Sequence, residues 1–472
     1  MPVMLEEITR EHRIALLIIS FAAFMASLDS TIVNISLPTI ASSFNVDISI
    51  VSWVSLAYLL VLASLLLVFG KLGDLYGFRR VFIAGFAVFA FGSLLCGLSE
   101  SIYQLIAFRA LQGIGGAALE ALAPAMILIY LPASRRGWAL GMLATVVSLG
   151  IAAGPILGGV ITEHISWHWI FLINVPVGII AVLLAARYLP ADVPSTSNAA
   201  FDTAGAALIL LALTTLLFPL NQGLELGWTS PIILGSFCAS LLFWVLFFIH
   251  EKHCKAPLVD MRLFSSHNYL FGNAAGLLIM MVYNGLIFLL PFFFEIVQGR
   301  SAESAGFLLA IPAIALMLVG PVSGSLSDRY GSRLPTLCAC ILAAAAMYLF
   351  SCFTPNTGLL FIIGAMALIG IAIGFFFPPN MSQILGSGGK EGEGVASSVM
   401  MTIRNTGSVF GVAIFGTIVV QVVIGMMAYR HVIAASPDVL STGFSIAFSI
   451  GIILCLAGAC LSAAVREERV VV

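Results

Sequence analysis

Charged side chains are scarce in this sequence. Asp, Glu, Lys and Arg make up 9% of the 472 residues, against about 25% in soluble domains, whereas hydrophobic residues make up 61%. The mean hydropathy is +1.11. This composition excludes a soluble globular domain and indicates an integral membrane protein. With a net charge of −2, the chain also lacks the basic face that nucleic acid would require, so we expect no nucleic-acid partner.

Several catalytic motifs are missing as well. No GxxxxGK[ST] loop is present to hold a nucleotide, which argues against an ATP-driven pump. The eight cysteines form no CxxC pair and have no histidine cluster beside them, so we interpret them as reduced, buried side chains and expect no disulfide and no metal site. Because no cluster has the spacing of a nucleophile or metal centre, we predict no enzymatic activity and no cofactor.

Long apolar runs fill most of the chain. A hydrocarbon core of about 30 Å needs about 20 apolar residues per helix, and membrane barrels would show short alternating segments instead. The sequence therefore predicts an all-α integral membrane fold with fourteen transmembrane helices. Their approximate limits are 14–36, 48–70, 80–98, 101–130, 137–162, 167–189, 203–221, 230–250, 268–297, 303–325, 334–353, 358–384, 395–425 and 442–465.

The positions of Lys and Arg predict the orientation. With the N-terminus in the cytoplasm, the outer loops keep only Arg300 and Arg430, and only Arg109 and Arg404 lie inside spans. All other Lys and Arg residues then face the cytoplasm, as the positive-inside rule requires. We predict a multi-pass protein of the plasma (inner) membrane with both termini cytoplasmic.

Two longer polar segments, 190–202 and 250–267, interrupt the series of short loops. They divide the spans into six, two and six. We predict two six-helix pseudo-symmetric bundles, at 1–190 and 267–472, and two inserted helices with flanking cytoplasmic loops at 191–266. We expect the inserted pair to be accessory and the protein to be a monomer whose partners are a small-molecule substrate and the lipid bilayer.

A similar cytoplasmic loop occurs once in each half, at 70–80 and at 324–333, each after the second helix of its half. Six identities in register predict two parallel repeats of six helices. Glycine allows the sharp turn, and aspartate accepts from backbone amides or pairs with Arg. We interpret both loops as cytoplasmic gates. The predicted gating residues are Gly70, Asp74, Gly77, Arg79, Asp328, Gly331 and Arg333.

Asp29 lies inside the first apolar run, where a charge costs about 2.5–3.5 kcal/mol on insertion scales. Helical spacing places Ser27, Thr31 and Asn34 on one face and Asp29 on nearly the opposite face. Arg109 in the fourth helix has a similar depth and is the candidate partner of Asp29. The sequence leaves open which face lines a cavity. If Asp29 packs away from it, only a conformational role survives.

Further polar groups lie inside spans. Glu120 shares one line of the fourth helix with Arg109, and both a cavity role and a local salt bridge remain open for it. Arg404 lies near mid-membrane and needs a partner or water. The other cavity candidates are Asn34, Gln112, Tyr283, Asn284 and Glu295.

The fifth helix is rich in small residues. Proline and clustered glycines bend a helix or let another helix approach closely. A hinge or seal that favours export and plain packing both account for this set, which is Gly150, Gly154, Pro155, Gly158 and Gly159.

Five of these segments together resemble the major facilitator superfamily and, within it, the fourteen-helix drug/proton antiporter family. Phe78 and His168 stand where the family more usually has basic residues. The matching segments are the helix-1 motif at 28–34, motif A at 70–80, motif B at 109–117, antiporter motif C at 150–159 and a further family segment at 167–178.

The resemblance implies a proton-driven exporter. We predict efflux of lipophilic, cationic drugs by alternating access, of the kind that gives antibiotic resistance, with the proton gradient as the energy source. The substrate would bind near Asp29, with Glu120 as the second candidate, and protonation would release it. The alternative is the same fold exporting a specific metabolite, peptide or lipid; a channel or a membrane enzyme agrees less well with the paired cytoplasmic loops.

Overall fold

The structure is a computed structural model that describes residues 9–132, 135–192, 202–254, 265–387, 393–426 and 435–465. Within these ranges every regular element is a helix. Fourteen helical segments are long and apolar enough to cross a membrane. The predicted all-α class and the number of spans are therefore confirmed.

The first half contains six spans, and the sixth is broken. The sequence predicted one helix over 167–189. In the structure the first part of this span ends just before Ile173 and the second part begins just after it. Pro176 has no N–H to donate to the carbonyl of Leu172, four residues earlier, which explains the break. The helices are α1 (Arg10–Phe44), α2 (Ile48–Tyr76), α3 (Phe78–Gly97), α4 (Ile102–Tyr130), α5 (Arg136–His164), α6 (Trp169–Leu172) and α7 (Asn174–Tyr188).

The inserted pair and the second half supply the remaining eight spans. The ninth span ends in a π-helical turn, η3, which begins two residues after Pro291. The elements are α8 (Thr203–Leu226), α9 (Pro231–His253), α10 (His267–Phe292), η3 (Phe293–Val297), α11 (Ala302–Tyr330), α12 (Arg333–Ser351), α13 (Leu359–Ser387), α14 (Glu393–Met426) and α15 (Pro437–Ala464).

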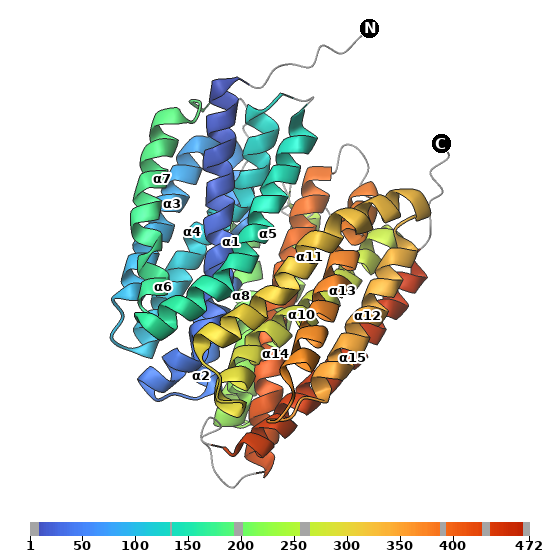
Figure 1. Ribbon diagram of the computed structural model, residues 1–472. Helices are drawn as coiled ribbons and strands as arrows, with labels where there is room; N and C mark the ends of the chain where they lie inside the picture. Colours follow the sequence, from blue (N-terminus) through green and yellow to red (C-terminus); the bar gives the residue numbers. More distant parts are fainter. Residues whose placement is uncertain are drawn as a thin grey trace.

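The two halves repeat the same packing. The pairs α1–α5, α2–α4 and α3–α7 of the first half correspond to α10–α14, α11–α13 and α12–α15 of the second. Figure 1 shows the blue-to-green half beside the yellow-to-red half. The predicted pseudo-symmetric bundles are confirmed, while their limits near 190 and 267 stay predictions because 193–201 and 255–264 lie outside the described residues.

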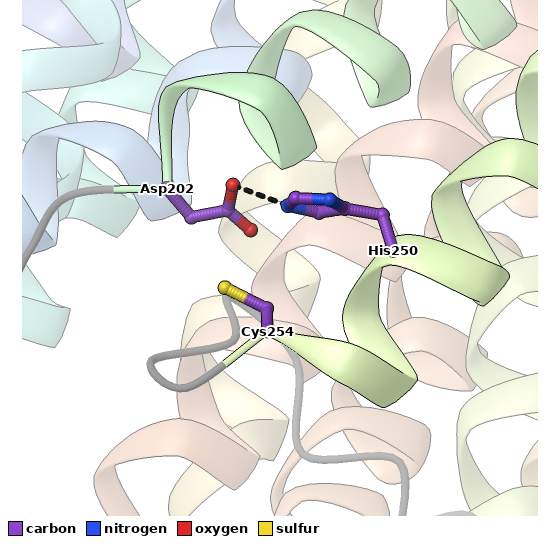
Figure 2. A group of neighbouring side chains, drawn as sticks. All are labelled: Asp202, His250 and Cys254. Carbon is purple, nitrogen blue, oxygen red and sulfur yellow. Dashed lines mark hydrogen bonds and ion pairs between the residues drawn. The ribbon is translucent and has the colours of Figure 1, made fainter.

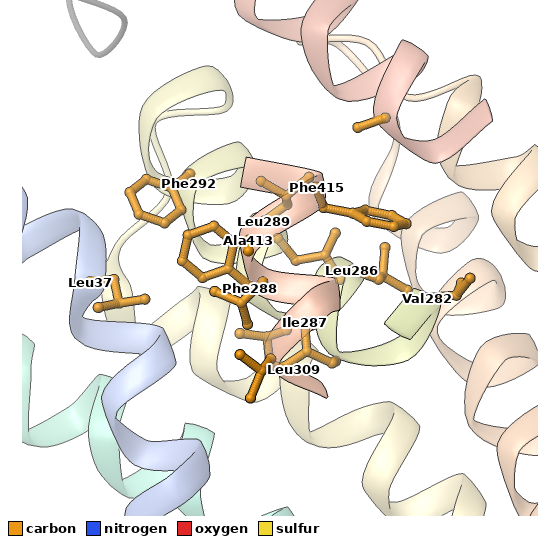
Figure 3. Packing of buried hydrophobic residues seen from close by; sticks show 14 of the residues in the cluster. Leu37, Val282, Leu286, Ile287, Phe288, Leu289, Phe292, Leu309, Ala413 and Phe415 are labelled. Atoms are coloured by element: carbon orange, nitrogen blue, oxygen red, sulfur yellow. The ribbon is translucent and has the colours of Figure 1, made fainter. Parts of the chain in front are cut away.

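Equivalent helices also form the contact between the halves. Helix α5 packs along α11, and its counterpart α14 packs along α2, while α8 touches both α2 and α14. Leu37 of α1, Phe288 and Phe292 of α10 and Leu309 of α11 belong to one buried apolar cluster (Figure 3). The two bundles therefore share a core at the end of α1 that the sequence predicts to face outward.

Close backbone approach holds helices together inside each bundle. A Cβ atom on Gly115 of α4 would lie 2.7 Å from the carbonyl oxygen of Gly85 and would overlap the backbone nitrogen of Phe89, both in α3. Lipid is as apolar as the side chains, so small residues that let backbones meet replace the hydrophobic effect as the source of helix association.

Gly115→Ala should therefore lower the thermal stability of the purified protein, because the obstacle is backbone and cannot rotate away. Gly141→Ala is the matched control, since a Cβ there meets nothing within 4 Å, and alanine favours the helix by about 1 kcal/mol. Melting followed by size-exclusion chromatography measures both variants. Equal melting temperatures for the two would contradict the packing argument.

Candidate functional site

A buried ion pair lies at the centre of the first bundle. Asp29 is 0% exposed and Arg109 is 1% exposed. Arg109 Nη1 donates to Asp29 Oδ2 at 2.7 Å. The other carboxylate oxygen, Oδ1, accepts from Gln112 Nε2 at 2.8 Å and from Asn174 Nδ2 at 2.9 Å. Both oxygens of Asp29 thus have donors, and the contacts join α1, α4 and α7.

The same group reaches two further helices. Gln112 Nε2 also donates to Ser93 Oγ of α3 at 2.7 Å. Arg109 Nε donates to the carbonyl of Val54 in α2 at 3.0 Å, and its guanidinium carbon lies 4.2 Å from the ring centroid of Tyr58. We call Asp29, Ser93, Arg109, Gln112 and Asn174 the Asp29 network. It links α1, α2, α3, α4 and α7.

The geometry decides which way Asp29 faces. The sequence proposed Arg109 as its partner, and the structure brings the two together. Asp29 points into its own bundle, whereas the opposite face of α1 carries Thr31 against α5 and Asn34, whose Oδ1 accepts from Ser55 Oγ at 3.0 Å. In this conformation Asp29 is buried and both of its carboxylate oxygens accept hydrogen bonds from its own bundle; a direct contact with substrate stays a prediction.

The small residues of α5 serve two different contacts. Cβ atoms on Gly150, Gly154 and Gly158 would collide with α1, at Phe24 O, Thr31 Oγ1 and Ile32 O respectively. These three positions, four residues apart, form one stripe along the helix. The stripe fixes α5 against α1 within the first bundle.

The other face of α5 meets the second half. A Cβ on Gly159 would lie 2.5 Å from the carbonyl oxygen of Ala302 in α11, and one on Gly306 would overlap the carbonyl of Pro155. Motif C therefore divides into a glycine stripe toward α1 and a Pro155–Gly159 face toward α11.

Polar contacts close the same end of the molecule. Glu163 Oε2 accepts from the backbone N–H of Ala302 at 3.1 Å, and His164 Nε2 lies 3.0 Å from Glu303 Oε2. Glu295, in η3, accepts a long bond of 3.5 Å from Thr39 of α1. All three contacts join the two bundles at the end predicted to face outward, so this end is closed.

Glu120 lies between the bundles. Its Oε1 accepts from Asn405 Nδ2 of α14 at 3.2 Å, and its side chain is half-buried. Arg404, next to Asn405, is near enough to interact electrostatically with Glu120, but the ion pairs found within 4 Å in the described ranges do not include these two. Of the two roles left open for Glu120, this geometry favours one in the space between the halves.

Arg404 has an aromatic neighbour. Its guanidinium carbon lies 4.2 Å from the ring centroid of Phe377 in α13. Its Nε is buried and has no acceptor among the described residues. The cavity candidates Tyr283 and Asn284 lie on α10. Asn284 Nδ2 donates to Met280 O in the same helix, whereas Tyr283 packs against the apolar core.

The two turns predicted to face the cytoplasm have the expected glycine geometry. Gly77 and Gly331 have φ values of 96° and 81°, which other residues rarely adopt. Nothing would contact a Cβ on Gly70 within 4 Å, and Arg333 is exposed. The side chains of Asp74 and Asp328 lie outside the described structure.

An aspartate that the sequence did not single out holds the first turn. Asp192 Oδ1 accepts from the backbone N–H of Arg79 at 2.8 Å, and its Oδ2 accepts from that of Arg80 at 3.2 Å. The Arg79 guanidinium donates to the carbonyl of Ala186 in α7. Here the loop is tied to the last helix of its own bundle, and Asp192 caps α3.

Sequence reasoning also missed Asn174 and Ser93. Asn174 is a lone amide in an apolar run, which is a usable signal because a buried amide needs a partner. Ser93 gives no such signal, since serine commonly bonds to its own helix.

Arg109→Gln should destabilise the protein strongly, by about 3–5 kcal/mol, because it leaves the buried carboxylate of Asp29 without its counter-ion. Combining it with Asp29→Asn should restore part of the loss, because no uncompensated charge remains. Melting temperatures of the two single variants and the double variant form the cycle. Strictly additive losses would show that the two side chains do not act as a pair.

Asp192→Ala should lower stability by about 1 kcal/mol, since the backbone amides of Arg79 and Arg80, the second and third residues of α3, lose their acceptor. Asp438→Ala is the control, because Asp438 lies in the first turn of α15, is exposed and makes no capping bond. A thermal melt compares them. A control that melts as early as Asp192→Ala would refute the capping role.

Known proteins of one transporter family match most of this chain. Residues 19–412 match the family model of the Major Facilitator Superfamily. The chain is 33% identical over 412 residues to the riboflavin transporter RibZ of Clostridioides difficile, covering 87% of this chain and 89% of that one. It is 32% identical to multidrug resistance protein 3 of Bacillus subtilis over 84% of this chain and 77% of that one.

Solved structures show the same fold. A bacterial homologue of the human lysosomal transporter Spinster, in an inward-facing and unoccupied conformation, superposes with a TM-score of 0.70. The alignment covers 96% of this chain and 97% of that one at 16% sequence identity, so the likeness concerns the fold alone.

Proposed function

Because this chain belongs to the major facilitator superfamily, a family of transporters, we propose that it exports lipophilic cationic compounds in exchange for protons by alternating access. The observation that carries this proposal is the 3.2 Å bond between Glu120 Oε1 and Asn405 Nδ2, which joins the two halves. It sets an acid at the inter-bundle contact. One carboxylate there holds a proton or a cation but not both, which couples the two movements.

Glu120 and Asp29 take different roles in this mechanism. Glu120 is half-buried and has a single described hydrogen bond, from the opposite half. It binds the cation when ionised and releases it when protonated. Asp29 and Arg109 instead position the helices, because their network lies inside one bundle. The direct coupling that the sequence assigned first to Asp29 passes to Glu120.

The proton gradient supplies the energy, and no cofactor enters the cycle. Exchange of one monovalent cation for one proton moves no net charge, so the pH gradient alone drives it. A second proton per cycle would add about 2.3 kcal/mol for each 100 mV of membrane potential.

The orientation and assembly are part of the proposal. The distribution of Lys and Arg supports a protein of the plasma membrane with both termini in the cytoplasm. The contacts of α5 with α11 then close the outer side of this conformation. We propose that it acts as a monomer, since each chain contains both halves of the pathway.

Glu120→Gln should abolish pH-driven efflux of a fluorescent lipophilic cation from proteoliposomes, because the amide accepts no proton at neutral pH. The wild type should respond to an imposed pH gradient and not to a potential alone. Glu100→Gln is the control, since Glu100 is exposed in the turn between α3 and α4. Unchanged coupled efflux in Glu120→Gln would overturn the assignment.

A third variant tests Glu295, another acid at the contact between the bundles, as the proton site. Glu295→Gln changes the acid near the closed end, whose Oε1 is buried without a partner among the described residues. If that variant alone loses coupling, the proton site is Glu295 and not Glu120.

A planar heteroaromatic metabolite is the second candidate substrate. Arg404 stacks on Phe377 and keeps its buried Nε without an acceptor in the described part of the chain, which suits a flat ligand that offers an oxygen or nitrogen. The resemblance to a riboflavin transporter favours the same class. Riboflavin transport that competes with the cation, and is lost in Arg404→Gln, would support this candidate.

A further inference from the structure

A second polar cluster lies at the ends of the inserted helices, on elements that do not contribute to the Asp29 network. Asp202 precedes α8, while His250 and Cys254 lie at the end of α9. The carboxylate oxygen, imidazole nitrogen and sulfur of these three residues lie within 4.8 Å of one another. Figure 2 shows the sulfur of Cys254 and the carboxylate of Asp202 turned toward the same space, with the imidazole beside them.

Hydrogen bonds account for only part of this cluster. Asp202 Oδ1 accepts from the backbone N–H of Gly205 at 2.8 Å, which caps α8, and lies 2.7 Å from His250 Nε2. Its Oδ2 has no hydrogen-bond partner among the described residues. The side chain is only 3% exposed, so this oxygen has little access to water. The helix cap and the contact with His250 involve only Oδ1 of Asp202. They do not account for the position of its Oδ2 or of the Cys254 thiol in this cluster.

A second carboxylate adds negative charge at the same place. Glu251 is 3% exposed. A Cβ on Gly205 would lie 2.9 Å from Glu251 Oε1 and would overlap Asp202 Oδ2, so the two acids meet above this glycine. Two carboxylates at one place produce a negative potential that attracts a cation.

We propose that Asp202, His250 and Cys254 form a Zn²⁺ site. One oxygen, one nitrogen and one sulfur ligand suit a borderline-soft ion, whereas Mg²⁺ and Ca²⁺ prefer oxygen alone. Tetrahedral Zn²⁺ with bonds of about 2.0–2.3 Å needs ligand atoms about 3.3–3.8 Å apart, which the 4.8 Å limit accommodates. Glu251 or water completes the coordination.

The position gives the ion a structural task. Asp202 is the first described residue after 193–201, and Cys254 is the last before 255–264. These segments connect the inserted pair to the two bundles. Zn²⁺ therefore fastens the start of α8 to the end of α9 where both connections begin. This site does not depend on the proposed transport chemistry.

The test uses the purified full-length protein, first stripped with a chelator and then titrated with ZnCl₂ against a chromophoric chelator. The wild type should bind one Zn²⁺ per chain. Cys254→Ser should weaken binding more than about tenfold, since even changes outside the ligand sphere cost roughly 10–100-fold. Co²⁺ in place of Zn²⁺ should give a thiolate charge-transfer band that Cys254→Ser abolishes.

Two variants of α9 serve as controls. Cys238→Ser changes an exposed cysteine, and His253→Gln changes an exposed histidine whose Nδ1 is bonded to Ile249 O; both should bind Zn²⁺ as the wild type does. Asp202→Asn keeps an N-capping side chain, so it should fold, as its melting temperature would show, yet lose the ion. A wild type without stoichiometric Zn²⁺, or one matched in affinity by Cys254→Ser, would overturn the site.

Discussion

The buried pair of Asp29 and Arg109 is the interaction on which the first bundle depends. Removing two charges from water costs several kcal/mol per ion, and only good geometry with further hydrogen bonds offsets this. Gln112 and Asn174 supply those bonds. Because helices in lipid gain little from general hydrophobicity, a network with one allowed geometry fixes their register. The five helices it joins should therefore move as one body.

Helix α5 packs between α1 of this body and α11 of the second half. Its glycine stripe holds α1 by backbone contact, whereas Pro155 and Gly159 touch α11 on the other side. A movement that opens the closed end must separate α5 from α11 and divide the apolar cluster that contains Leu37 and Leu309. It need not disturb α1 and α5. In the proposed cycle the equivalent contact of α14 with α2 would act as the pivot.

Some of this was accessible from sequence and some was not. Spans and repeats follow from local hydropathy and from loop positions, because bilayer thickness acts on each segment separately. The similar depths of Asp29 and Arg109 in the membrane were enough to predict that they pair, as the structure shows. Pro176 contained the signal for the break at Ile173, but the long apolar run hid it. Asp192 gave no signal, because an aspartate in a polar linker is ordinary.

The cluster of Asp202, His250 and Cys254 at α8 and α9 gave no sequence signal for a related reason. Spacing rules detect ligands that lie close together in the chain. Asp202 and Cys254 are separated by two entire helices, and only their antiparallel packing brings the ligand atoms together.

The contrast between the two acids follows from where their hydrogen-bond donors come from. All side-chain donors to Asp29 belong to its own half, on α4 and α7, so rigid-body movement leaves its surroundings unchanged. The donor to Glu120 is Asn405 of α14, in the opposite half, so the same movement makes or breaks that bond. A proton is coupled to a conformational change only through a group whose environment differs between the two conformations. By this criterion the proposed coupling role suits Glu120 better than Asp29, although Asp29 is the more deeply buried acid.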